Sequence, residues 1–307
     1  MAVATSFTAP NYSGLLYTKT NRRTPFLNSI GAPVISDHVE FAVNQEYDLG
    51  TPAQPAISET ASLTAPQPTS VARTQATNVC QIFHESVGSS YAHESNMGTL
   101  SGINAAGQQP NPNAELAWQI ARRMEKIAND INYTFLNGAY NKASSDATIN
   151  KTRGILAAVT SNAETYTTLS RADIVKILRD VFEKNGVVDG GILTMNAAMK
   201  VALTALYEDA TGFVLPASRN VGGVAIDQIV TDFGTVGVTI DQMMPANTIL
   251  FYNPSVVRPV EMYVPGKGNF FYEELSKVGA GTTGQIFGQI GLDYGPEWYH
   301  AKLTKSA

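Results

Sequence analysis

The chain has 307 residues, of which 44% are hydrophobic and 15% are charged, and its formal net charge is -5 at pH 7. It has no cluster of Lys and Arg, which excludes the class of nucleic-acid-binding proteins that obtain their affinity from many phosphate contacts. No apolar run reaches the ~18 residues of a membrane-spanning helix, and the N-terminus lacks the layout of a signal peptide. The single cysteine, Cys80, excludes an intramolecular disulfide and is typical of folding in a reducing cytoplasm.

The first part of the chain predicts an arm followed by a long two-stranded loop. Residues 1–33 show no hydrophobic periodicity. In 34–43, apolar and polar residues alternate with the period of a strand, and 71–87 is strand-like and free of proline. Between them, residues 51–70 contain four prolines and one charge. We therefore expect a strand, a proline-rich tip and a second strand.

Residues 113–137 give the strongest helix pattern in the chain, after a linker-like stretch at 88–113. Asn113 is a predicted N-cap, and Gly138 is predicted to end the helix. At 1.5 Å per residue the helix would be about 37 Å long. Its apolar residues recur at steps of three and four and form one stripe: Leu116, Ile120, Met124, Ile127, Ile131 and Phe135.

The remainder of the chain mixes short helices and strands. Ser170 and Asn196 are predicted to cap two helices, because Ser and Asn are favoured N-cap residues. Strands are predicted at 190–195, 224–231, 236–240 and 248–252, and longer strands in 256–307. In the latter, one strand face is expected to carry Ile286, Ile290, Leu292 and Tyr294, and EWYHAKL to form the last strand. The fold class is therefore α+β.

Two motifs resemble ligand sites but fit other structures better. The segment GAGTTG at 279–284 matches G-x-G-x-x-G, but dinucleotide binding needs a helix after the loop. Here a strand follows, which indicates a hairpin turn. The dipeptides His84-Glu85 and His93-Glu94 place their histidines nine residues apart, whereas the zinc motif H-E-x-x-H needs a spacing of four.

The other reactive residue types also favour structural roles. Cys80 lies beside Ile82 and Phe83 in a predicted strand, which is typical of a small buried hydrophobic residue. Glu273 and Glu274 are adjacent in a strand, so they point to opposite faces and cannot act as an acid–base pair. We expect no enzymatic activity, no cofactor and no metal site.

The order of elements resembles the Hong Kong 97-type major capsid proteins of tailed bacteriophages. Local stretches also resemble one branch of this fold: TPFLNSIG at 24–31, NVCQIFHESVGSSYA at 78–92, LAWQIARRMEKIANDINYTFLNG at 116–138, TRGILAAV at 152–159 and GQIGLDYGPEWYHAKL at 288–303. The resemblance implies five regions: an N-terminal arm at 1–33, an extended β-hairpin loop at 34–87, a linker and spine helix at 88–151, an axial domain at 152–255 and a peripheral β-segment at 256–307.

The resemblance explains the proline-rich tip. A solitary two-stranded ribbon is marginal in water, and its prolines limit pairing along its edges. If the ribbon lies on a neighbouring subunit, its two isolated apolar residues, Ile57 and Leu63, can bury there. We therefore expect inter-subunit contacts from Ile57, Leu63 and the one charged residue of the tip, Glu59.

The resemblance implies a structural protein that self-assembles into pentamers and hexamers and closes an icosahedral head around double-stranded DNA. The expected location is the virion capsid, assembled in the host cytoplasm, with portal, scaffolding and decoration proteins as further partners. Proximity to the packaged DNA would be non-specific, and no membrane is involved. The alternatives are an encapsulin-type shell, another virion structural protein such as an adhesin, and a small β-rich enzyme. An adhesin would show heptads or fibre repeats, which the sequence lacks.

Overall fold

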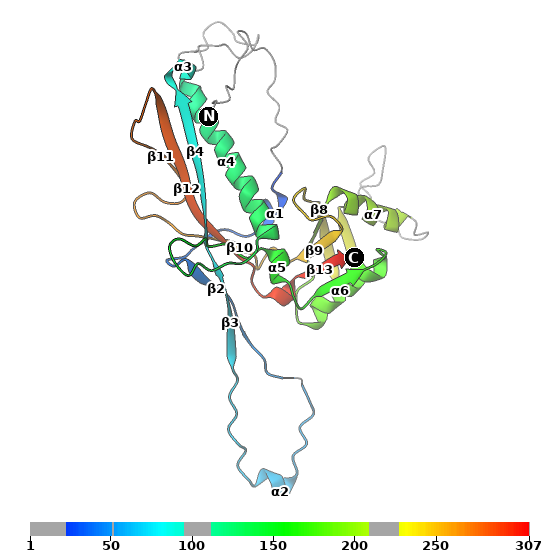
Figure 1. The fold of residues 1–307 in the computed structure, drawn as a ribbon. Helices are drawn as coiled ribbons and strands as arrows, with labels where there is room; N and C mark the ends of the chain where they lie inside the picture. Colours follow the sequence, from blue (N-terminus) through cyan, green and yellow to red (C-terminus); the bar gives the residue numbers. More distant parts are fainter. Residues whose placement is uncertain (1–22, 51, 95–111, 209–226, 307) are drawn as a thin grey trace.

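The computed structural model describes residues 23–50, 52–94, 112–208 and 227–306. Figure 1 shows a body with two sheets and a long hairpin that projects away from it. Most of the expected N-terminal arm, 1–22, lies outside the described residues, as do 95–111 of the expected linker and the first part of the strand expected at 224–231. From residue 23 onward the fold is α+β, as the sequence predicts.

The first sheet, which we call the peripheral sheet, is built around one long strand. Its order is β1-β10-β12-β11, and β4 pairs with β12 along the other side. The strands are β1 (Val34–Ile35), β4 (Gln81–Ser90), β10 (Arg258–Glu261), β11 (Phe271–Glu274) and β12 (Gly281–Asp293). Ile286, Ile290, Leu292 and Tyr294 are buried, as predicted.

Helix α4 (Pro112–Asn137) packs on one face of this sheet and confirms the predicted long helix. Ile127, Ile131 and Phe135 are buried, whereas Met124 is 37% exposed. The helix ends just before Gly138, as expected, and the reason is close packing. A Cβ on Gly138 would lie 2.6 Å from the carbonyl oxygen of Thr152, in the loop that follows the helix. The following loop can therefore fold directly against the end of the helix.

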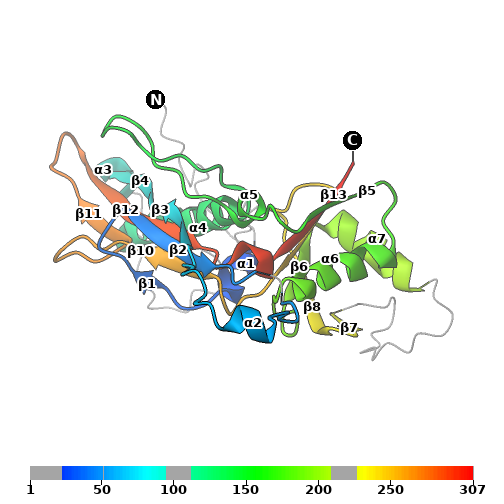
Figure 2. The same ribbon diagram turned by 90° about the horizontal axis from the view of Figure 1, so that it is seen from below.

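The second sheet, the axial sheet, has the order β5-β13-β9-β6-β8-β7. Its strands are β5 (Ala163–Tyr166), β6 (Ile192–Met195), β7 (Gln228–Thr231), β8 (Gly234–Ile240), β9 (Thr248–Tyr252) and β13 (Ala301–Lys305). The helices α6 (Arg171–Glu183) and α7 (Ala197–Glu208) lie beside it (Figure 2). The caps predicted at Ser170 and Asn196 are present: Ser170 Oγ accepts from Asp173 N–H, and Asn196 Oδ1 accepts from Met199 N–H at 2.8 Å. The cap predicted at Asn113 is wrong, because α4 already begins at Pro112.

Strand β9 is buried on both faces and separates two hydrophobic cores. Ile249 and Phe251 pack with α6 and α7 in one core. Leu250 and Tyr252 belong to the other core, which also contains Ile127 of α4 and residues of the peripheral sheet. Since successive side chains of a strand point to opposite faces, one strand serves both cores. The core around α4 thus extends under both sheets.

The projecting hairpin, which we call the extended hairpin, pairs β2 (Glu40–Tyr47) with β3 (Arg73–Val79). The strand expected at 34–43 is divided into β1 and β2. The hairpin is also shorter than the range 34–87, because the strand expected at 71–87 is divided at Cys80. Its second part, β4, pairs with β12 of the peripheral sheet. Sequence periodicity cannot show this exchange, because both halves have the same alternation.

Short helices connect the larger elements. They are α1 (Pro25–Ser29), α3 (Tyr91–Glu94), α5 (Ile155–Ala158) and the 3-10 helix η1 (Glu297–Tyr299). The last strand expected over EWYHAKL begins only at Ala301, because η1 occupies its first residues. Phe26 of α1 is fully buried, and its ring lies 4.9 Å from that of Tyr252. This contact places the start of the described chain between α4 and the axial sheet.

Candidate assembly surfaces

The tip of the extended hairpin presents the three residues singled out in the sequence around one helical turn. This turn, α2 (Glu59–Ser62), was not predicted, although Ser58 is its N-cap and accepts a hydrogen bond from Ala61 N–H at 3.2 Å. Ile57 precedes the turn and is 73% exposed; Leu63 follows it and is 84% exposed. Glu59 is also exposed. The turn brings two apolar side chains and one carboxylate to the far end of the molecule (Figure 1).

Beyond its base, the extended hairpin contributes nothing to the core of its own subunit. Every described residue from Tyr47 to Gln75 is exposed. Five large apolar side chains are among them: Tyr47, Leu49, Ile57, Leu63 and Val71. Their number on one projecting hairpin fits a segment that another protein covers.

The base of the hairpin is held rigidly by a buried amide. Asn78 is 0% exposed; its Nδ2 donates to Leu292 O at 2.7 Å and to Arg153 O at 3.2 Å. Its Oδ1 accepts from Arg153 N–H at 2.8 Å. Because buried amides are costly to leave unpaired, these bonds fix the register of β3 against the body. The extended hairpin therefore leaves the body in a defined direction.

Aromatic packing and an exposed ion pair add to this base. The ring of Phe41 lies over Gly291, where a Cβ would come within 2.7 Å of it. Lys142 bonds to the carboxylate of Glu40, which also accepts from Thr77 Oγ1 at 3.0 Å. The hydrogen bond from Lys142 lowers the pKa of Glu40. Since the pair is exposed, packing of Phe41 is the stronger restraint.

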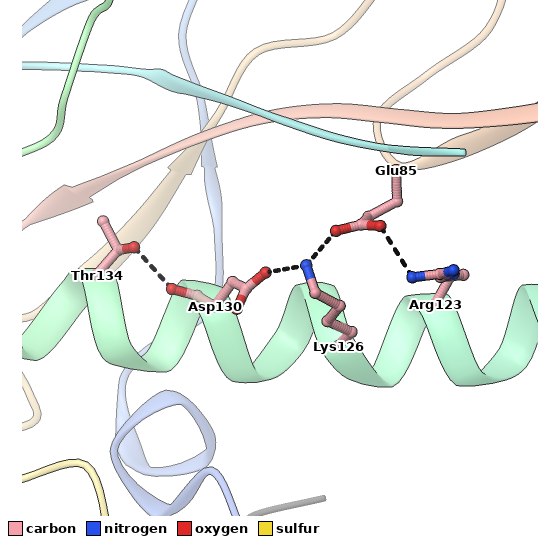
Figure 3. A network of polar contacts seen from close by, with 5 residues as sticks. All are labelled: Glu85, Arg123, Lys126, Asp130 and Thr134. Atoms are coloured by element: carbon pink, nitrogen blue, oxygen red, sulfur yellow. Dashed lines mark hydrogen bonds and ion pairs between the residues drawn. The ribbon is translucent and has the colours of Figure 1, made fainter. Parts of the chain in front are cut away.

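Charged residues join β4 to α4 (Figure 3). Glu85 pairs with Arg123 at 3.3 Å and with Lys126, and Lys126 also reaches Asp130 at 3.0 Å. The Glu85 side chain is 18% exposed, so this carboxylate is partly buried between the strand and the helix. Its hydrogen bond raises the pKa of Lys126. The network thus ties one turn of α4 to the middle of β4.

His84 and Glu85 do not form a metal site together. Glu85 faces α4, whereas the exposed His84 lies 3.1 Å from Gln285 Oε1 and packs edge-on against Phe287. His93 lies in α3, away in the sequence from this pair. In the part of the chain that the structure describes, no group of three or more His, Cys, Asp or Glu could hold a metal ion.

The glycine-rich motif and the cysteine occupy the positions expected from the sequence. Gly279 and Ala280 end the turn between β11 and the antiparallel β12, and residues 281–284 begin β12, which confirms the hairpin turn. No helix follows, so no helix dipole faces a phosphate there. Cys80 is 1% exposed, which confirms the predicted buried cysteine, and burial raises the pKa of its thiol to about 11.

His300 has a structural role that the sequence did not reveal. It is fully buried; Asn253 N–H donates to its Nδ1 at 3.3 Å, and its Nε2 lies 2.7 Å from Tyr294 O. Because Nδ1 accepts, Nε2 carries the proton and donates to that carbonyl. Burial lowers the pKa of His300 to about 4. The neutral ring thus connects segments that pass between the two sheets.

Comparison with known families identifies this arrangement. The family model of the SU10 major capsid protein matches residues 1–307. The chain belongs to this family. It is a structural capsid protein of bacteriophage virions, and both its family and its fold are those of structural proteins. Among the described residues, no helix is long and apolar enough to cross a membrane. No curated protein matches the sequence.

Solved structures confirm the Hong Kong 97-type fold. The capsid asymmetric unit of cyanophage A-1(L) is 13% identical, with a TM-score of 0.64 over 95% of this chain and 96% of that one. The capsid of an empty GTA particle is 14% identical, with a TM-score of 0.61 over 97% and 100% of the two chains. The holo-SrpI encapsulin complex of Synechococcus elongatus PCC 7942 is 10% identical, with a TM-score of 0.63 over 96% and 92%.

Proposed function

We propose that this capsid protein self-assembles into hexamers and pentamers that close an icosahedral head around double-stranded DNA. The observation that carries the proposal is the extended hairpin, in which every described residue from Tyr47 to Gln75 is exposed. A second copy that covers Ile57 and Leu63 would gain roughly 1.5–3 kcal/mol for each buried side chain, before entropy costs. Glu59 would lie in the same contact.

The proposal also covers where the shell assembles and which molecules it contacts. The head assembles in the host cytoplasm, and portal, scaffolding and decoration proteins are its further partners. The net charge of -5 favours a container that lies near DNA without sequence preference. The protein acts without catalysis, cofactor or metal, in line with its structural family.

The five regions expected from the sequence are part of the same proposal. Residues 1–33 act as the arm, 88–151 as linker and spine and 152–255 as the axial domain. The peripheral segment is narrowed from 256–307, because β13 (Ala301–Lys305) belongs to the axial sheet. We narrow the extended loop from 34–87 to the paired range 40–79, since β4 belongs to the peripheral sheet.

A second candidate is an encapsulin-type shell that encloses protein cargo. The TM-score to the SrpI encapsulin, 0.63, is close to the 0.64 for the capsid of cyanophage A-1(L), so similarity of structure supports an encapsulin-type shell as well as a phage head. The family match over the whole chain decides for the phage capsid.

Electron microscopy of the purified full chain tests the function. We expect closed shells or capsomers, formed alone or with the scaffold and portal supplied from the same phage, and particles from infected cells should show the absorbance of nucleic acid. A monomer at all concentrations, with those partners present, would contradict a shell protein. Shells that copurify with protein cargo and without nucleic acid would support the encapsulin alternative.

A further inference from the structure

The long strand that runs through β3 and β4 exchanges its partner at Cys80. Before it, β3 pairs with β2; after it, β4 pairs with β12 over ten consecutive residue pairs. Among the described residues, β4 has no other strand beside it. The edge of β4 opposite β12 is therefore unpaired; it lies on the same side of the long strand as β2, which ends where β4 begins.

Two backbone hydrogen bonds show which amides point to that edge. Tyr91 N–H donates to Ala280 O at 3.2 Å, in the register of the β4–β12 ladder. Because bonding pairs alternate in an antiparallel ladder, odd-numbered residues of β4 bond to β12 and even-numbered residues point away. Accordingly, Cys80 N–H donates to Val39 O, on the side of β2. The open edge thus presents the backbone groups of Ile82, His84, Ser86 and Gly88.

This edge lacks the usual protection against pairing. Folded proteins protect sheet edges with short strands, prolines, lysines or bulges. The described strands at the other edges of the two larger sheets, β1, β5, β7 and β11, have two to four residues. β4 has ten, with no Pro, Lys or Arg and an uninterrupted register. Its one carboxylate, Glu85, faces α4 and is neutralised there by Arg123 and Lys126.

A groove beside the first half of this edge has room for a further segment. It is lined by Gln81–Glu85 of β4 and by Ile127, Asp130, Tyr133 and Thr134 of α4. Ile82 and Tyr133 are each 56% exposed at the groove. An extended segment there would satisfy the outward amides and cover both apolar side chains, as in β-strand addition.

We propose that the open edge of β4 accepts an extended strand from a second copy of this chain, so that the peripheral sheet continues across a subunit boundary. This rests on the proposed function, because a shell of one chain brings copies side by side. The extended hairpin supports the choice of a second copy. It projects away from its own body (Figure 1), and within the described part of the chain β2 and β3 pair with each other and with no third strand. Each copy therefore offers strand edges that its own larger sheets do not use.

Residue-resolved hydrogen exchange of the full chain, free and assembled, tests the proposal. In the free subunit, we expect fast exchange at the amides of Ile82, His84, Ser86 and Gly88 and slow exchange at their odd-numbered neighbours. Assembly should slow the even-numbered amides by about 100-fold or more. If they stay fast in intact shells, the proposal is wrong although the proposed function stands. If they are already slow in the free subunit, the partner strand belongs to the same chain, and the proposal is also wrong.

A proline substitution separates backbone pairing from simple burial. Ser86→Pro removes an amide that points away from β12, and proline is tolerated at such positions of edge strands. We expect the variant subunit to keep its melting temperature within a few degrees and to lose shell formation. Ser86→Ala, which keeps the amide, should assemble normally. Normal shells from a folded Ser86→Pro protein would overturn the proposal.

Discussion

Strand β9 and the tip of the extended hairpin place similar apolar residues in opposite surroundings. All five residues of β9 are buried, and its side chains fill two cores. At the tip, Ile57 and Leu63 are 73% and 84% exposed, although the turn between them has an ordered cap. The axial sheet therefore obtains its stability within the subunit, whereas the hairpin has an ordered shape without a core of its own. Four variants test this contrast, from the core outward.

The largest effect is expected at the spine helix, where Ile127 is 3% exposed. Ile127→Asp would bury an unpaired charge, so the free energy of unfolding should fall by about 3–5 kcal/mol. Urea denaturation of the subunit measures this. Met124→Asp is the matched control, because Met124 is 37% exposed on the same helix and should cost less than about 1 kcal/mol. Equal losses in the two variants would contradict the assigned face of α4.

The next effect is a dependence on pH at His300. Its pKa is lowered from 6.5 to about 4, so the unfolded chain binds a proton in this range and the folded one does not. The stability of the folded state should therefore fall as the pH falls from about 6.5 to 4, by about 3 kcal/mol from this group. Above pH 6.5, the contribution of His300 to the free energy of unfolding should be fully present. The pH dependence of urea midpoints measures it, and His300→Gln should flatten the curve in that window. An unchanged slope would show that His300 already titrates normally.

A smaller effect is expected where β4 meets α4. Glu85→Gln removes the carboxylate that Arg123 and Lys126 share, and both cationic side chains are about half exposed. The loss of stability should be about 0.5–1 kcal/mol and should shrink at high salt. Thermal melting at low and high salt checks this. Glu125→Gln, at the exposed pair with Arg122, should lose less. A loss above 3 kcal/mol would mean that the network behaves as a buried ion pair.

The smallest effect on folding is expected at the hairpin tip, together with a large effect on assembly. Changing Ile57 and Leu63 together to Ser should alter the free energy of unfolding by less than about 0.5 kcal/mol, because both are already exposed. Shells seen by electron microscopy should become rare. Thr60→Ala, within the same turn, serves as the control. Loss of the subunit fold would place the tip in an intramolecular core, and normal shells would make it dispensable.

Local features of this fold could be predicted from the sequence. The length of α4 and the caps at Ser170 and Asn196 follow from residue patterns within one or two helical turns. The exchange of partners at Cys80 could not be predicted, because β4 pairs with residues about 200 positions away. The roles of Asn78 and His300 also depend on partners outside their own segments: Leu292, 214 positions from Asn78, and Asn253, 47 positions from His300. Ile57, Glu59 and Leu63 were found because they stand out in a stretch of small residues, but their inter-subunit role is still a prediction.

The sharing of one core by both sheets has a consequence for how the subunit unfolds. Leu250 and Tyr252 of the axial sheet pack in the same core as Ile286 and Ile290 of the peripheral sheet. Opening either half would expose the apolar side chains of the other, so the two halves are thermodynamically coupled. A single calorimetric transition is therefore expected for a subunit that looks divided in outline. During synthesis, β9 can pair with β6 first, but its other edge stays unpaired until β13 (Ala301–Lys305) has been made.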